Sequence, residues 1–395
     1  MESEPSTKLD FENTEIAFSY KSDKELKRLK WLFTMMNNSG LVKLGSMFTP
    51  LALKLNLPFV RPALKATIFK QFVGGENLLD TQKTIDLLFR YGTLTILDYG
   101  AESKTSEDEL DAVMSETIMA IELAASNSSV PVVSTKLTGL APNDLLTKMQ
   151  TDAELTGGEQ RQKDKLYSRI DSICKRAHDL KVGVMIDAEE SWLQISIDNL
   201  VDEMMALYNK SSVIVSNTFQ LYRHDKLQFL KKSHSKAKSN GYMLGAKLVR
   251  GAYMDKERAY ALENNIDSVI NIDKDATDLA YNNALKYCVE NYETIGSVCA
   301  SHNVKSNLFQ AELIEKNNID KSHPHLNFCQ LLGMSDNITF NLAQGGYNVA
   351  KYLPYGPLKE VVPYLIRRAK ENTSITGDMS RELKLIETEL KRRYL

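Results

Sequence analysis

The feature that most constrains the fold is a regular alternation, from about residue 91 onward, of short apolar runs with longer segments of helical spacing. The apolar runs predict strands at 94–100, 130–138, 182–190, 212–220, 243–253, 296–303, 325–333 and 347–356. Roughly 20–45 residues with few helix breakers separate most of these runs. Alternating strands and helices favour parallel pairing, and eight such units favour closure. We therefore predict an α/β fold, a (β/α)8 barrel of the TIM type.

The rest of the chain is predicted to be helical. We expect an N-terminal helical arm over residues 1–90, the barrel over residues 91–380 and a helical tail over residues 381–395. Residues 255–293 are too many for one helix between two strands and are predicted to include a loop. Long connections of this kind are compatible with a barrel, whose loops vary widely in length.

The arm contains an unusual segment, Leu41–Gly75, which has five basic residues and no acidic one. Its basic residues alternate with apolar ones, and three prolines, Pro50, Pro58 and Pro62, are expected to break it into pieces. Two interpretations stay open. The pieces could lie on an anionic membrane surface, or the arm could pack on the main domain with its basic face in solvent.

The composition excludes several classes of protein. A net charge of −2 over 395 residues argues against a nucleic-acid-binding surface. The four cysteines form no CxxC pair, so we expect reduced core residues and no zinc site. The first residues resemble neither a secretory signal nor a mitochondrial transit peptide, and no apolar stretch reaches the ~18 residues needed to span a bilayer. GxGxxG, Walker A and GxSxG motifs are absent from the sequence.

Polar residues gather at the carboxyl ends of the predicted strands, where the active site of a β/α barrel forms. They are Asp98, Glu102, Lys136, Asp187, Glu189, Glu190, Asn217, Gln220, Lys247, Arg250, His302, Asn303, Tyr352 and Tyr355. A single buried charge among them would be explained by a structural ion pair. The whole set, at one end of the strands, predicts a site.

A second signal lies in the last helix of the barrel. Tyr364, Arg367, Arg368 and Glu371 are spaced i, i+3, i+4 and i+7 and share one helical face. Adjacent arginines can bind a carboxylate through charge-assisted, bidentate hydrogen bonds. The alternative is a solvated arginine pair on a surface helix.

Taken in order, several motifs resemble the proline dehydrogenase family, in its stand-alone form. They are ILDYGAE, STKLTGLAP, MIDAEESW, NTFQLY, AKLVRGAY, ASHN, QLLGM, YLPYGP and PYLIRRAKEN, within residues 72–372. The resemblance implies a distorted β/α barrel that holds FAD without a covalent bond. It implies oxidation of L-proline to Δ1-pyrroline-5-carboxylate by hydride transfer to the flavin, which a quinone at a membrane then reoxidises.

The resemblance also implies residue roles. For the substrate, Arg367, Arg368 and Lys136 match carboxylate-binding residues, Glu102 pairs with the arginines, Asp187 orders the pocket, and Tyr352, Tyr364 and Leu331 surround the ring. For FAD, the matching residues are Asp187, Asn217, Lys247, Val249, Gly251, Ala252, His302, Asn303 and Glu371. Lys247 and Met254 depart from the bifunctional bacterial members, which have Arg and Trp there, and Asn271–Thr277 matches the family poorly.

Three alternatives remain. A sister enzyme oxidises 4-hydroxyproline, but those members have a small Ser where this chain has Tyr352. A metal-dependent lyase or hydrolase would use Asp187, Glu189, Glu190 and His302. A regulatory, DNA-binding protein would need a basic module before the barrel, which the sequence lacks. For localisation, we expect a bacterial cytoplasmic enzyme peripheral to the inner membrane, or a mitochondrial one if the source is eukaryotic and a presequence has been removed.

Overall fold

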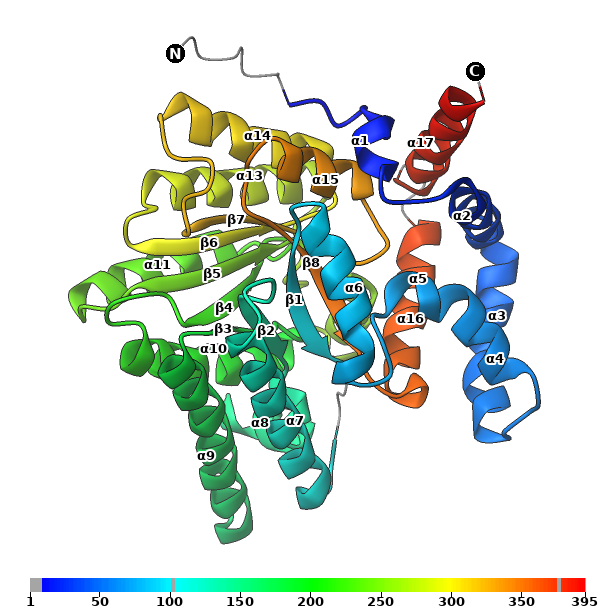
Figure 1. Ribbon diagram of the computed structural model, residues 1–395. Helices are drawn as coiled ribbons and strands as arrows, with labels where there is room; N and C mark the ends of the chain where they lie inside the picture. Colours follow the sequence, from blue (N-terminus) through cyan, green and yellow to red (C-terminus); the bar gives the residue numbers. More distant parts are fainter. Residues whose placement is uncertain (1–8, 101–103, 152, 375–377, 395) are drawn as a thin grey trace. The chain divides into compact units, whose positions relative to one another are not determined.

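The computed structural model describes residues 9–100, 104–151, 153–374 and 378–394, and it describes their side chains except those of residues 370–380. Eight parallel strands form a closed barrel in the order β1 to β8, as predicted (Figure 1). The strands are β1 Leu94–Tyr99, β2 Val132–Thr135, β3 Gly183–Ile186, β4 Val215–Gln220, β5 Leu244–Val249, β6 Ile295–Ala300, β7 Leu326–Leu331 and β8 Val349–Tyr355.

Helices follow the strands and form the arm and the tail. Those of the barrel are α7 Glu107–Ala125, α8 Asn143–Met149, α9 Gly157–Leu180, α10 Ser191–Tyr208, α11 Lys226–Ser239, α12 Met254–Glu263, α13 Lys274–Glu290, α14 Val304–Lys316, α15 Asp336–Gln344 and α16 Leu358–Ser374. Those of the arm and tail are α1 Thr14–Phe18, α2 Asp23–Met36, α3 Ser39–Lys54, α4 Val60–Leu64, α5 Lys70–Phe72, α6 Leu78–Arg90 and α17 Asp378–Arg393. A π-helical turn, Lys65–Phe69, links α4 to α5.

The local sequence explains where several helices begin. Ser22, Ser106 and Thr156 each cap a helix, and each is followed three residues later by a glutamate that completes a capping box. The side-chain oxygen of the capping residue accepts a hydrogen bond from an N–H of the first turn, and the glutamate carboxylate accepts one from the backbone N–H of the capping residue, so two N–H donors at the helix start are paired. The long connection over residues 255–293 contains α12 and α13 with a loop between them, as predicted.

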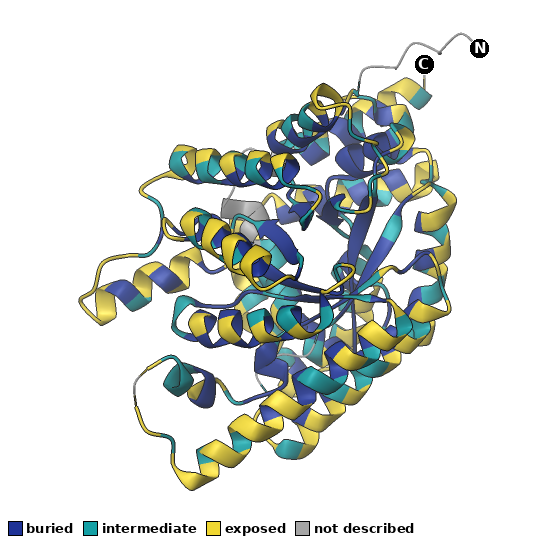
Figure 2. Ribbon diagram, turned by 90° about the vertical axis from the view of Figure 1, so that its left-hand side faces the viewer, coloured by how far each residue is buried: buried dark blue, intermediate teal, exposed yellow. Residues whose placement is uncertain are grey.

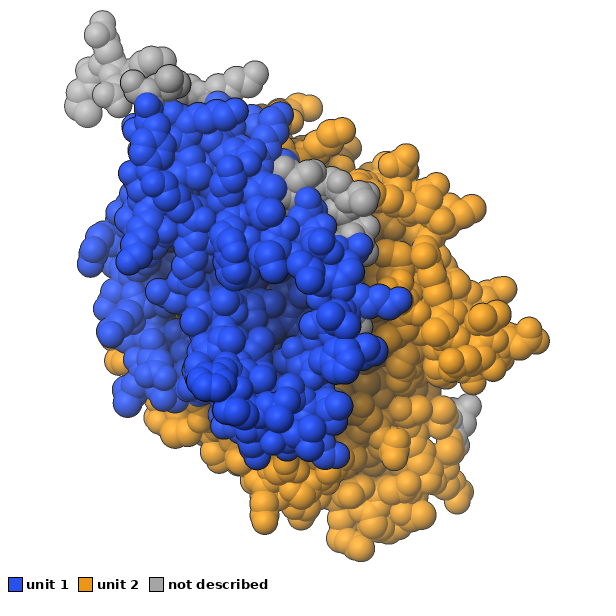
Figure 3. Space-filling view, turned by 90° about the vertical axis from the view of Figure 1, so that its right-hand side faces the viewer, with its two compact units in different colours: residues 1–95, 330–395 blue, residues 96–329 orange. Residues whose placement is uncertain are grey.

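The chain folds as two compact units, residues 1–95 with 330–395 and residues 96–329 (Figure 3). In the second unit the strands are almost entirely buried and the outward faces of the helices are exposed (Figure 2). Parallel register partners, such as Lys247 opposite Thr218, point to the same side of the sheet. Gly245 lies on that side too, and a β-carbon there would come within 2.3 Å of the Val215 carbonyl oxygen.

The first unit has a core of its own, to which both ends of the chain contribute. Phe18, Phe33, Phe72, Leu365 and Ile386 belong to this one apolar cluster. The C-terminal helix α17 forms hydrogen bonds at the edge of this core. There Thr14 donates to Glu389 Oε2 at 3.0 Å, and an Arg393 Nη2 donor lies 2.9 Å from the Phe18 carbonyl oxygen.

Two expectations about the arm and the cysteines can be compared directly with the structure. The prediction that Pro50 interrupts the helix is wrong, because α3 continues through it from Ser39 to Lys54. A proline inside a helix costs about 3 kcal/mol and bends it without always ending it. Pro62 lies in the first turn of α4, where its missing N–H needs no partner.

All four cysteines are buried free thiols, as expected. Within the residues that the structure describes, no helix is long and apolar enough to cross a membrane.

Candidate active site

A cluster of two lysines and two aspartates lies at the carboxyl ends of β1, β2, β3 and β5. Lys247 Nζ lies 2.6 Å from Asp187 Oδ1. Lys136 Nζ lies 3.5 Å from Asp187 Oδ2 and 3.8 Å from Asp98 Oδ2. The structure therefore brings together four of the polar residues expected at the strand ends, Asp98, Lys136, Asp187 and Lys247, of which Lys247 lies within β5. We call this set the lysine–aspartate cluster.

Strand geometry explains why these side chains meet. Asp98 is opposite Ser134 in the β1–β2 register, and Lys136 follows two positions later on the same side. Ser134 Oγ donates to Asp187 Oδ1 at 3.1 Å, which gives that carboxylate a second type of partner. The side chains are only 4–14% exposed. Charges so enclosed are tolerated because each has an opposite charge beside it.

The other acidic residues after β3 have different partners. Glu189 accepts hydrogen bonds from the Thr138 N–H and hydroxyl, at 3.1 and 2.7 Å, and burial raises the pKa of this carboxyl to about 7. Glu190 pairs with Lys256 at 2.5 Å. Among the described residues, no group of three or more His, Cys, Asp or Glu is placed to hold a metal ion. Because Asp187 is held by two lysines and Glu189 by Thr138, the geometry gives no support to the metal-dependent alternative.

The two amides of β4 have different environments. Asn217 donates to Asp198 Oδ1 on α10 at 2.9 Å, so its side chain is committed to the helix layer. Gln220 follows Asn217 by an odd number of residues, so its side chain points to the opposite side of the sheet. Thr218 and its register partner Lys247 lie on that same side as Gln220. Its Nε2 donates to the Glu189 carbonyl at 2.7 Å. Our expectation singled out Asn217, whereas the alternation along the strand could have pointed to Gln220.

The segments that follow β5 and β6, which are expected to contact FAD, are joined through Arg250. Its guanidinium bonds Asp278, Ser301 and Ser306 at 2.8, 2.8 and 3.0 Å. Val249 ends β5, and Gly251 and Ala252 follow as exposed loop residues. Gly251 has φ +137°, a conformation that favours glycine. After β6, partly buried His302 precedes Asn303, whose side chain caps α14 by accepting from the Ser306 N–H at 3.0 Å.

The first unit contains a different group of predicted residues. Leu331 is the last residue of β7, and Tyr352 lies on β8 with 5% exposure. The Lys351 side chain points to the N-terminus of α15, where it pairs with Asp336. Neighbouring residues of a strand point to opposite faces, so Tyr352 points away from α15.

The arginine pair lies on α16, as predicted. The guanidinium carbon of Arg368 lies 5.4 Å from the centre of the Tyr364 ring, a cation–π contact within the expected face of the helix. Arg367, Arg368 and Tyr364 are all half-buried, which disagrees with a fully solvated arginine pair. Glu102 and the side chain of Glu371 lie outside the described residues.

Comparison with known proteins decides the family. A family model described as proline dehydrogenase matches residues 81–381, well over half of the chain. The chain belongs to the proline dehydrogenase family. It is therefore an oxidoreductase that acts on CH–NH groups, and the family resemblance predicted from the sequence is confirmed.

Similar proteins differ in what their names say they do. The carbapenem antibiotics biosynthesis protein CarD of Pectobacterium carotovorum is 32% identical over 82% of this chain and 84% of its own. Proline dehydrogenase 1, mitochondrial, of Dictyostelium discoideum is 32% identical over 89% and 68%. Hydroxyproline dehydrogenase of Xenopus laevis is 30% identical over 95% and 88%.

The structural comparison supports the fold alone. Proline utilization A from Bdellovibrio bacteriovorus, inactivated by N-propargylglycine, superposes with a TM-score of 0.71 at 22% identity. The match covers 92% of this chain and 36% of the solved one. The chain thus spans about a third of that protein's length.

Proposed function

We propose that this enzyme oxidises L-proline to Δ1-pyrroline-5-carboxylate, with non-covalently bound FAD as hydride acceptor and a quinone as the final electron acceptor. The observation that carries the proposal is the lysine–aspartate cluster, in which Asp187 lies 2.6 Å from Lys247 and 3.5 Å from Lys136. Two cations at the strand ends of a barrel in this family suit a reaction that accumulates negative charge.

The chemistry of the residues present fits FAD. Lys247 offers a buried ammonium group, and Arg250 holds three strand-end and helix residues together. Gly251 lets the loop backbone lie against the Tyr222 ring, where a β-carbon would come within 2.4 Å. When bound, FAD would supply a two-electron acceptor. The residues that would hold it are Asp187, Lys247, Val249, Gly251, Ala252, His302, Asn303 and Glu371. We add Gln220 as an amide donor and assign Asn217 a supporting role, through Asp198.

The substrate would be held by its carboxylate. Arg367 and Arg368 would bind it in a bidentate manner, with Lys136 as a third cation and Glu102 orienting the arginines. Tyr352, Tyr364 and Leu331 would pack against the pyrrolidine ring. Fixing both ends of a small ring directs one C–H toward the acceptor, so catalysis would come from proximity and needs no nucleophile. The amine proton would leave to solvent.

Electrons would then pass to a quinone, and we propose that the enzyme works as a peripheral protein at the membrane that contains it. Several relatives are named mitochondrial, among them those of Dictyostelium and Arabidopsis thaliana. In a bacterial source the corresponding place would be the cytoplasmic side of the inner membrane.

The first experiment is an absorbance spectrum of the purified protein before and after anaerobic addition of L-proline. A flavin spectrum that bleaches with proline supports both cofactor and substrate. If the properly folded protein, once supplied with FAD, shows no absorbance from protein-bound flavin, the proposal is wrong.

Oxidation of 4-hydroxyproline is the second candidate, because the Xenopus relative carries that name and is 30% identical over 95% of this chain. Tyr352 favours proline, since a bulky ring beside the substrate would crowd an added hydroxyl group. Flavin that bleaches with 4-hydroxyproline but not with L-proline would favour this candidate.

A further inference from the structure

Helix α3 exposes an apolar face that the fold of its own unit does not cover. Of the 22 large apolar side chains that are exposed in the described residues, eight lie between Leu41 and Phe59. Within the helix they recur three or four residues apart, at Leu41, Leu44, Met47, Phe48 and Leu51, so they share one face. The helix buries only Leu53. An exposed apolar surface of this extent is typical of an interaction site.

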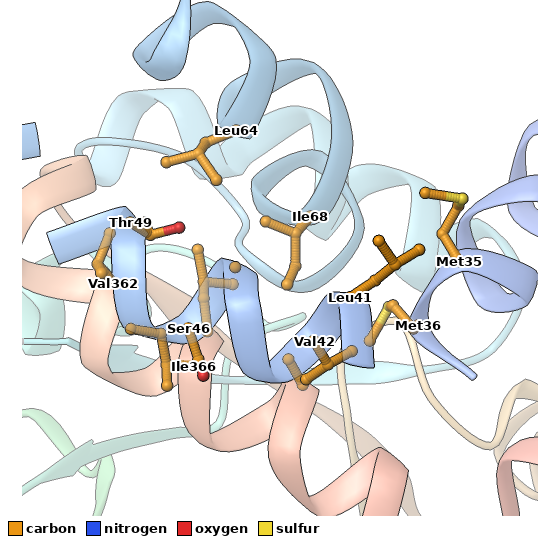
Figure 4. Close-up of a pocket in the computed structure, with 13 residues that line it drawn as sticks. Met35, Met36, Leu41, Val42, Ser46, Thr49, Leu64, Ile68, Val362 and Ile366 are labelled. Atoms are coloured by element: carbon orange, nitrogen blue, oxygen red, sulfur yellow. The ribbon is translucent and has the colours of Figure 1, made fainter. Parts of the chain in front are cut away.

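A second side of α3, which shares Leu41 with the exposed face, is apolar as well and lines a groove of about 230 Å³. Residues from α2, α3, the α4–π-helix segment and α16 converge on this space (Figure 4). Its lining is uncharged, and its two hydroxyl residues are Ser46 and Thr49. Ser46 already donates to the Lys43 carbonyl at 2.9 Å. For comparison, an apolar cavity of about 150 Å³ binds benzene, so this groove has room for part of an aliphatic chain.

The segment that carries this face has only basic charged residues. Residues 41–75 contain Lys43, Lys54, Arg61, Lys65 and Lys70 and no acidic residue, in a chain whose net charge is −2. Lys65 pairs with Glu76, but among the described residues no carboxylate lies within ion-pair distance of Lys43 or Lys54. Apolar side chains flanked by free cations match a bilayer with anionic headgroups. A second copy would present the same basic surface and be repelled in a two-fold contact.

We infer that the α3 face, residues 41–59, inserts into the surface of an anionic lipid bilayer, and that the groove behind it takes the aliphatic chain of a membrane lipid. The groove is lined on one side by Val362, Ile366 and Ala369 of α16. Arg367 and Arg368 belong to the same helix. The lipid would thus pack against the helix that carries the proposed carboxylate-binding pair. The inference rests on the proposed function in two places: it names the surface for the proposed membrane contact, and its link to Arg367 and Arg368 depends on their proposed role.

The test is co-sedimentation of the full-length protein with vesicles of phosphatidylcholine alone or with phosphatidylglycerol. We expect binding to the anionic vesicles and at least about tenfold weaker binding of the double variant Phe48→Ser/Phe59→Ser. Lys43→Glu/Lys54→Glu should weaken binding at low ionic strength, with a smaller effect in high salt. Leu79→Ser and Lys83→Glu change exposed residues of α6 and should bind like the unmodified protein.

Insertion and groove occupancy have separate readouts. Trp31 lies on α2 one turn before Met35, which lines the groove, and is 53% exposed. Vesicles with brominated acyl chains should quench its fluorescence, and Trp31→Phe should abolish that quenching. Gly45→Leu fills the groove from a position where a β-carbon meets no atom within 4 Å, and it should reduce quenching.

Two results would overturn the inference. One is vesicle binding that is unchanged in both double variants. The other is a dimer that Phe48→Ser/Phe59→Ser converts to a monomer, without vesicle binding by either form, since the face would then join two copies. Neither measurement involves proline or FAD, so a failure of the proposed proline and FAD chemistry leaves the vesicle result standing.

Discussion

Lys351 Nζ lies 2.9 Å from Asp336 Oδ1, and the two side chains are only 1% and 4% exposed. The same ammonium group donates to the carbonyl oxygens of Met334 and Leu331, at 2.5 and 3.4 Å. Asp336 in turn accepts from the Tyr20 hydroxyl at 2.6 Å. Burial by itself would raise the pKa of Asp336, but Lys351 and Lys21 hold it below its usual range. One buried ion pair therefore joins the arm, the loop after β7 and strand β8.

Removing Lys351 should destabilise the protein strongly. Lys351→Met leaves Asp336 as a buried charge with weaker compensation, which typically costs on the order of 3–5 kcal/mol. Chemical denaturation of the two proteins measures the difference. The double variant Lys351→Met/Asp336→Asn should recover much of the loss, because it removes both charges. Equal destabilisation of the single and double variants would contradict the role of the pair.

Replacing Arg367 should impair substrate binding while the fold is retained. We expect Arg367→Met to lower kcat/KM for proline roughly 30- to 150-fold, mainly through KM, because a charge-assisted bond to the carboxylate is lost. Steady-state kinetics provide the measurement. Lys359→Met changes an exposed residue of the same helix and is the control. A similar loss in both variants would argue for a general defect of α16.

Lys247 should affect the bound flavin. In Lys247→Met, Asp187 keeps Lys136 at 3.5 Å but loses its partner at 2.6 Å. We expect a lower flavin content and a more negative flavin midpoint potential, since a cation that stabilises the reduced form is gone. Absorbance and dye-linked redox titration measure both. Lys247→Arg keeps the charge and should stay close to the unmodified enzyme, and a normal potential in Lys247→Met would refute this role.

Tyr352 should set the preference between proline and 4-hydroxyproline. Tyr352→Ser makes space beside the ring and should raise the ratio of kcat/KM for 4-hydroxyproline over proline about tenfold or more. Tyr352→Phe keeps the bulk and should keep the preference. Competition assays with both substrates measure the ratio directly. An unchanged ratio in the serine variant would place substrate selection elsewhere.

Glu382 should make stability depend on pH. Burial, followed by the charge of Asp336, raises the pKa of this carboxyl to about 7, and it accepts from the Ser335 N–H at 2.9 Å. A raised folded-state pKa gives a contribution that is fully present below about pH 4.5 and is lost as pH rises through about 7. Glu382→Gln should therefore raise Tm at pH 8 relative to the unmodified protein, with the difference vanishing near pH 5.

The control for this prediction lies on the same helix. Glu387 is half-exposed and pairs with Lys30, so Glu387→Gln should change Tm little and similarly at both pH values. Thermal unfolding followed by fluorescence at several pH values makes the comparison. A Glu382→Gln effect that is the same at pH 5 and pH 8 would refute the buried, ionising carboxyl as its cause.

The strands could be read from the sequence because buried parallel strands form short, continuous apolar runs. The run predicted at 94–100 became β1 Leu94–Tyr99, whereas that at 182–190 became only Gly183–Ile186. The difference arises because Asp187, Glu189 and Glu190 belong to the loop that carries the polar residues. The apolar pattern thus overestimates the length of a strand where polar residues of the candidate site follow it.

Side-chain direction and ion pairing were less accessible to sequence reasoning. The contacts of Lys136 and Lys247 with Asp187 depend on the register between strands, which no local pattern contains. The Lys351–Asp336 pair was missed, because a lysine inside an apolar run has no sequence signal for its partner. The continuation of α3 through Pro50 likewise depends on packing that the local sequence does not specify.

The arm and the C-terminal helices share one core, although residues 96–329 lie between them in the chain. During translation, at about 5–20 residues per second, the arm would wait roughly ten to fifty seconds before α16 and α17 emerge from the ribosome. Leu26, Leu29 and Phe33 of α2 would be uncovered throughout that interval. The nascent chain should therefore bind chaperones more strongly than the finished enzyme does. A premature stop before α16 should give an insoluble product even though most of the barrel has been made.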